Sequence, residues 1–187
     1  MAAENLKTEV IAETYASVVF ELAIEEDKCQ QMFEELSDLA DLLEQEKDFT
    51  SILCSPFVQL SEKIALVDKV LDGKADKLAI GLLVSMLRRD RLRYLKDTTR
   101  VYEKLLDEHN GIKRIDVTVA SQMTDEQKTE LEKKLSDAVN AQVKIIYSID
   151  PEILGGIIIR HGGEYVDNSL RRILSDAKSR IKNKIKA

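Results

Sequence analysis

The fold is decided by residues 111–127, GIKRIDVTVASQMTDEQ, where the spacing of the apolar residues changes. Residues 115–119 alternate between apolar and polar side chains, which is typical of a half-buried β-strand. Thr124 and Gln127 then form the pattern of a capping box, which predicts the start of a helix. The segment therefore marks the change from an all-helical region to a region that mixes strands and helices.

Residues upstream of Gly111 show only helical periodicity, with apolar side chains recurring every three or four positions. Pro56 disfavours a helical residue before it, and Gly73 is an expected C-terminal stop. Ser61 is an expected helix N-cap, and Asp76 is expected to open the next helix. Because each apolar stripe needs a partner, we expect a mainly α fold that begins with a six-helix bundle. The expected helices are residues 8–29, 30–45, 48–55, 61–71, 76–90 and 92–108.

Residues downstream of Gly111 predict a small α+β domain with the order β-α-β-β-β-α. The Gly162-Gly163 pair predicts a tight hairpin between its last two strands. We place the domain boundary near residue 110, which gives domains 1–109 and 110–187. The expected strands are residues 112–119, 143–149, 157–159 and 165–166, and the expected helices are 124–139 and 170–185.

The charge is distributed unevenly along the 187 residues, whose net charge is −6. Residues 1–108 carry −9 and residues 109–187 carry +3, which suggests two modules with different partners. The longest apolar runs are far too short to span a membrane, and residues 1–7 lack the apolar core of a signal peptide. We therefore expect any membrane association to be indirect.

The sequence lacks the motifs of the common catalytic sites. It has no phosphate-binding loop and no nucleophile elbow, and the Gly155-Gly156 pair opens a strand rather than a helix. His109 and His161 stand at a boundary and a hairpin, and neither cysteine has a second ligand at metal-binding spacing. We therefore expect no catalytic residues, no cofactor and no metal, and an enzyme is the least favoured class.

Two other classes remain open on the residues alone. The cluster at residues 88–93, RRDRLR, could serve a nucleic-acid-binding regulator, but an acidic module would repel a phosphate backbone. We therefore expect no nucleic-acid partner. A generic helical adaptor for protein interactions is the stronger alternative.

Six segments in order along the chain form a recognisable set, namely 15–23 (YASVVFELA), 91–92 (RL), 117–120 (VTVA), 124–127 (TDEQ), 150–159 (DPEILGGIII) and 166–174 (VDNSLRRIL). Together they resemble the delta subunit of F-type ATP synthases, also called the oligomycin-sensitivity-conferring protein family. Gln122-Met123 and Asn168 depart from that family's usual pattern, and Asn168 can replace a glycine because Asn tolerates the left-handed conformation.

The resemblance implies a non-catalytic connector between the catalytic head and the peripheral stalk, which resists the torque of the rotor. The helical bundle would sit on the head near the beta subunits, as one monomeric copy per complex. A groove between its first and fifth helices would hold the N-terminal helix of one alpha subunit. The groove residues would be Tyr15, Val18, Val19, Leu22, Leu82, Ser85, Met86 and Arg89.

The resemblance also implies that the C-terminal module binds the b subunits of the stalk. Gly155, Gly156 and Asp167 would shape this module, and Arg171 would contact the stalk. The location would be peripheral, on the cytoplasmic face of an energy-transducing membrane, here the plasma membrane of a bacterium.

Overall fold

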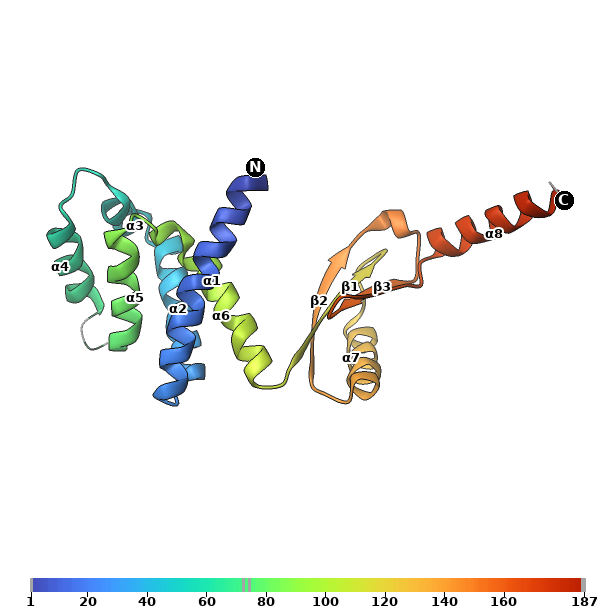
Figure 1. Cartoon of the computed structure of the whole chain (residues 1–187), viewed down its shortest axis with the longest axis horizontal. Coiled ribbons are helices and arrows are strands. Elements are labelled where there is room, and N and C mark those ends of the chain that lie inside the picture. The colour runs from blue at the N-terminus through green and yellow to red at the C-terminus, as the bar shows by residue number, and fades with distance from the viewer. Residues whose placement is uncertain (1, 72, 74, 186–187) are drawn as a thin grey trace. The chain divides into compact units, whose positions relative to one another are not determined.

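The computed structural model describes residues 2–71, 73 and 75–185, and it is mostly helical (Figure 1). The chain divides into two compact units, Met1–Leu106 and Asp107–Ala187. The elements of the first unit are α1 (Ala2–Glu25), α2 (Cys29–Gln45), α3 (Lys47–Cys54), α4 (Leu60–Leu71), α5 (Lys77–Arg88), the 3-10 helix η1 (Leu92–Tyr94) and most of α6 (Leu95–His109).

The second unit contains the predicted succession of strands and helices. Its elements are β1 (Lys113–Val119), α7 (Asp125–Val139), β2 (Val143–Ile149), the 3-10 helix η2 (Pro151–Ile153), β3 (Ile157–His161), β4 (Glu164–Asp167) and α8 (Leu170–Ile185). The predicted order β-α-β-β-β-α is confirmed over the residues that the structure describes. What each unit binds stays a prediction at this point.

The first helix differs from its predicted bounds at both ends. It begins at Ala2 rather than at residue 8, and it ends at Glu25 rather than at residue 29. Asp27 takes a positive φ of 54°, and the amide of Lys28 donates to the carbonyl of Ala23 at 2.9 Å. A left-handed residue with this hydrogen bond ends a helix, so the chain turns there before α2 begins.

The helix starts predicted at Ser61 and Asp76 have different outcomes. Ser61 lies inside α4, and the carbonyl of Gln59 accepts the amide of Lys63 at 3.1 Å, so that prediction was wrong. Asp76 does cap α5, because its Oδ1 atom accepts the amide of Leu78 at 2.9 Å. The predicted helix start at Asp76 is confirmed, and the cap itself fixes where α5 begins.

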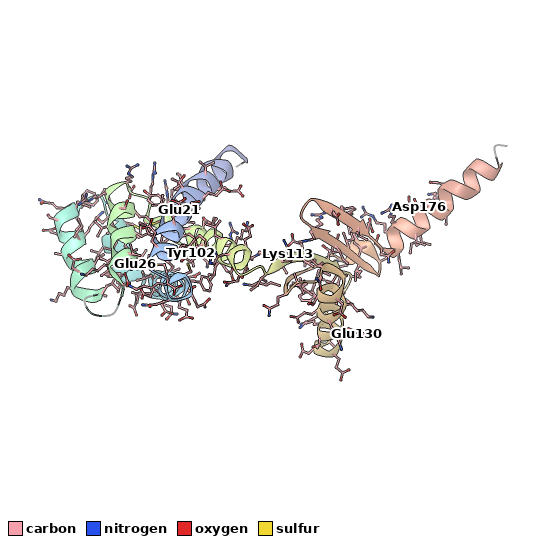
Figure 2. All side chains as sticks on the ribbon, turned by 60° about the horizontal axis from the view of Figure 1, so that its bottom comes forward. Glu21, Glu26, Tyr102, Lys113, Glu130 and Asp176 are labelled. Carbon is pink, nitrogen blue, oxygen red and sulfur yellow. The ribbon has the colours of Figure 1, made fainter. Side chains whose placement is uncertain are left out.

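The first unit is built around an aliphatic core to which α1, α2, α5 and α6 all contribute. Tyr102 of α6 is fully buried and lies among these helices (Figure 2). Its ring meets that of Phe20 edge-on at 5.2 Å, and its hydroxyl donates to the carbonyl of Cys29 at 3.0 Å. A buried hydroxyl needs such a partner, so this bond ties α6 to the start of α2.

The second unit is a four-stranded mixed sheet with the order β2-β1-β3-β4. β1 runs parallel to β2 and antiparallel to β3, and β3 runs antiparallel to β4. Two parallel neighbours need a crossover, which α7 supplies. The core lies between the sheet and α7, where Ile115, Val117 and Val143 meet Leu131 and Leu135.

Local residues set the turns of this unit as expected. Thr124 accepts the amide of Gln127 at 3.3 Å, and Gln127 accepts the amide of Thr124 at 3.0 Å, so the predicted capping box is present. Gly162 and Gly163 form the two-residue hairpin between β3 and β4, with φ values of 54° and 89°. Positive φ at both positions suits the twist of a hairpin.

Candidate docking surfaces

The first unit carries a groove of about 400 Å³ between α1 and α5. Seven of the eight residues predicted for a partner helix line it, namely Tyr15, Val18, Val19, Leu22, Leu82, Ser85 and Arg89. Met86 does not line the groove, because its side chain is fully buried in the core. The structure therefore brings most of the predicted set together at one surface.

The groove also contains residues that sequence reasoning missed, namely Thr14, Lys77, Leu78, Gly81 and Arg91. The α5 members could have been found from spacing, because residues 78, 81, 82, 85 and 89 follow one helical face at intervals of one, three or four. Arg91 lies beyond the end of α5, where the spacing argument stops.

The groove exposes apolar side chains to solvent. Val18 is 53% exposed and Leu22 is 40% exposed, whereas Val19 and Leu82 are buried beneath them. A contiguous apolar strip between two helices is typical of a surface that receives a third helix. This strip is therefore a candidate docking surface for an amphipathic helix.

A polar cluster joins the two helices at one end of the groove. The Nζ atom of Lys28, just after α1, donates to Asp76 at 2.9 Å and to Glu26 at 2.9 Å. The amide of Asp76 donates to Glu35 of α2 at 2.7 Å. The end of α1 thus lies beside the start of α5, so the two helices are antiparallel (Figure 1).

These contacts shift the acid–base equilibria of the pair. The pKa of the Asp76 carboxyl is lowered, first by the hydrogen bond from the Leu78 amide and then by the bond from Lys28. The pKa of the Lys28 amine is raised by its bonds to Glu26 and Asp76. Both groups are therefore held in their charged forms.

In the second unit, the predicted residues surround the start of α8. Gly156 has a φ of 77°, and a Cβ atom added there would lie 2.1 Å from the carbonyl oxygen of Asn168. The amide of Leu170 donates to the carbonyl of Gly155 at 2.9 Å. Only a glycine at residue 156 lets the two backbones approach this closely, so the pair positions α8 against the strand.

Asp167 and Arg171 organise the same turn. Asp167 accepts the amide of Ser169 at 2.9 Å. The Ser169 hydroxyl first, and then this amide, lower the pKa of the Asp167 carboxyl. Arg171 lies 3.3 Å from Glu152 of η2. Asn168 does not take a positive φ, so the turn forms without the left-handed conformation that asparagine tolerates.

The helix α8 exposes an apolar stripe. Leu170 is 46% exposed, Ile173 is 53% and Leu174 is 58%, and these positions share one helical face. In Figure 1 α8 extends away from the sheet of its own unit. This face forms a second candidate docking surface.

The structure places the members of the basic cluster at residues 88–93 in different surroundings. Arg89 and Arg91 line the groove, whereas the guanidinium of Arg93 stacks on the ring of Tyr94 at 4.9 Å.

Among the described residues, no helix combines the length and the apolar character that a membrane crossing needs. The same part of the chain contains no group of three His, Cys, Asp or Glu side chains able to hold a metal ion.

The chain is similar to known proteins over most of its length. Residues 11–181 match the family model described as "ATP synthase delta (OSCP) subunit". The ATP synthase subunit delta of Clostridioides difficile (strain 630) is 33% identical over 173 residues, which cover 92% of this chain and 96% of the relative. The subunit of the same name from Agrobacterium fabrum is 31% identical and is matched over 94% of both chains.

A solved structure shares the fold at low identity. A chain of the mitochondrial ATP synthase hexamer of Toxoplasma gondii superposes with a TM-score of 0.62 at 18% identity, covering 91% of this chain and 96% of that one. The likeness extends over both units. The chain therefore belongs to the ATP synthase delta (OSCP) subunit family and is a non-catalytic subunit of the peripheral stalk of F-type ATP synthase.

Proposed function

We propose that the first unit, as a six-helix bundle, binds the N-terminal helix of one alpha subunit in the groove between α1 and α5. The observation that carries this proposal is the exposed apolar strip of Val18 and Leu22 beside the groove-lining face of α5. Burying an apolar side chain contributes about 1.5–3 kcal/mol, so two or three anchors support a specific contact.

The second unit binds the b subunits of the stalk through the exposed face of α8. Leu170, Ile173 and Leu174 supply an apolar stripe about one turn long. The position of this face depends on the start of α8, which is fixed against β3 by Gly155, Gly156 and Asp167. Arg171 lies on the same turn and contributes charge to the contact.

With one partner on each unit, a single copy of the chain holds the catalytic head against the torque of the rotor. Its function is mechanical. The beta subunits lie nearby on the head, and the chain reaches the membrane only through the stalk. Its place is the cytoplasmic face of a bacterial plasma membrane.

Two substitutions test the two contacts against each other. Titration calorimetry would measure binding of the full chain to a peptide of the alpha N-terminal segment, and separately to the cytoplasmic domain of subunit b. Val18→Asp places an unpaired charge in the groove and should abolish peptide binding only. Ile173→Asp should weaken binding of the b domain only.

Val10→Asp is the matched control for the first change, since Val10 is 59% exposed on α1 and does not line the groove. It should leave peptide binding unchanged. If Val18→Asp bound the peptide as tightly as the wild-type chain, the groove would not be the alpha site. If Ile173→Asp left the affinity for b unchanged, α8 would not be the stalk contact.

A further inference from the structure

Gly81 is unusual because it stands in the middle of α5 and faces the groove. A glycine inside a helix costs about 0.5–1 kcal/mol relative to alanine. The backbone of Gly81 is helical, and a Cβ atom added there would meet no described atom within 4 Å apart from its chain neighbours and the adjoining backbone of α5. Neither the conformation nor the packing of the described unit therefore requires a glycine at this position.

Ser85 stands one turn after Gly81 and also lines the groove. Two small residues four positions apart lie on one helical face. The distance between packed helix axes depends on the side chains at the crossing, so small residues allow a close approach. On the α5 side of the groove, the side chains therefore project least at Gly81 and Ser85, where a bound helix could approach α5 most closely.

The groove also has a charge of its own. Among its described lining residues, the charged ones are Lys77, Arg89 and Arg91, all cations, although residues 1–108 carry a net charge of −9. Lys77 lies at the first end of α5, and the two arginines follow its last turn. Twelve helical residues span about 18 Å, so the cations mark the two ends of a groove about three turns long.

We infer that the groove takes an acidic amphipathic helix of about three turns, which crosses α5 closely at Gly81 and Ser85 and carries a carboxylate near each end of its apolar stripe. The inference rests on the proposed function, which makes this helix the alpha N-terminal segment. Gly81 and Ser85 set how deeply the helix sits, and Lys77 and Arg89 fix its register.

The test measures stability and affinity together, with the full chain and a synthetic peptide of the alpha N-terminal segment of the same synthase. Gly81→Ala and Gly81→Gln should raise the melting temperature, because both residues favour a helix and the site is open. Both should weaken peptide binding, Gly81→Gln by roughly tenfold or more. Ser61→Gln, on the exposed side of α4, is the matched control and should leave the affinity unchanged.

Charge is tested by the double variant Lys77→Gln with Arg89→Gln. It should weaken binding and flatten the dependence of affinity on salt. The control is Lys47→Gln with Lys69→Gln, two exposed cations outside the groove.

The outcomes separate the inference from the proposed function. Peptide binding that is unchanged in a folded Gly81→Gln chain would overturn the close crossing, while the alpha contact would stand. If the double variant of Lys77 and Arg89 binds the peptide with the same salt dependence as the wild type, the inferred pairing of these cations with carboxylates of the bound helix would be wrong. A wild-type chain that does not bind the peptide would overturn the proposed function together with this inference.

Discussion

Lys28 donates a hydrogen bond to the Oδ2 atom of Asp76 at 2.9 Å, and this contact joins the end of α1 to the start of α5. Asp76 uses its other carboxylate oxygen to cap α5 at Leu78. One carboxylate therefore fixes where α5 begins and how it meets α1. Because both helices wall the groove, Asp76 also positions the groove-lining residues that follow it.

Asp76→Ala should lower the free energy of unfolding by about 1 kcal/mol, because the amide of Leu78 loses its cap. Asp76→Asn should cost less, since asparagine caps helices well but cannot pair with the Lys28 amine as a charge. Urea denaturation followed by circular dichroism measures both. Equal losses for the two variants would show that the charge, rather than the cap, carries the effect.

Stability should also depend on pH through Asp76. The pKa of its carboxyl is lower in the folded chain than in the unfolded chain, where it is about 3.9. The folded state therefore gains stability above that value and loses it as the pH falls through the lower, folded pKa. The free energy of unfolding should fall more steeply below pH ~4 in the wild type than in Asp76→Asn. Parallel profiles would contradict the shift.

Gly156→Ala should destabilise the second unit strongly. A Cβ atom at residue 156 would lie 2.1 Å from the carbonyl oxygen of Asn168, and φ is 77° there. Gly163→Ala is the matched control, because Gly163 also has a positive φ, of 89°, but open space around it. The control should cost about 1–2 kcal/mol from backbone strain alone.

Hydrogen exchange of the sheet amides measures the loss of stability of the second unit in each variant, without a contribution from the first unit. Gly156→Ala should speed exchange in β3 and at the start of α8 more than Gly163→Ala does. Equal protection in the two variants would mean that the close approach to Asn168 contributes nothing.

Tyr102→Phe should lower the free energy of unfolding by about 1–2 kcal/mol, since the hydroxyl of this fully buried residue bonds to the carbonyl of Cys29. Tyr94→Phe is the control, because Tyr94 lies nearer the surface. Thermal unfolding of both variants would show the difference. A Tyr102→Phe chain as stable as the control would mean that the carbonyl finds another partner.

Much of the fold follows from local sequence signals. The capping box at Thr124, the hairpin at Gly162 and the helix start at Asp76 each depend on neighbouring residues, and the structure confirms all three predictions. Ser61 failed because a serine can cap a helix or stand in its first turn, and packing decides between the two. Asp27 ended α1 early through a left-handed turn that few sequence signals announce.

The groove was only partly predictable, for a physical reason. The spacing of residues in the sequence predicts which of them share a helical face, but how deeply each side chain is buried depends on the neighbouring helices. Met86 shares the apolar pattern of α5, yet it points into the core and is fully buried. Arg91 reaches the groove only because the chain turns at Asp90, whose φ is 53°.

The central claim is that this one chain links the head to the stalk. Sedimentation of an alpha–beta–gamma head that lacks this subunit, mixed with the cytoplasmic domain of subunit b, tests it most directly. We predict that the b domain sediments with the head only when the full chain is added, that Val18→Asp abolishes this and that Ile173→Asp weakens it. Two results would contradict this claim: the b domain sediments with the head when the chain is absent, or it fails to sediment with the head when the chain is present.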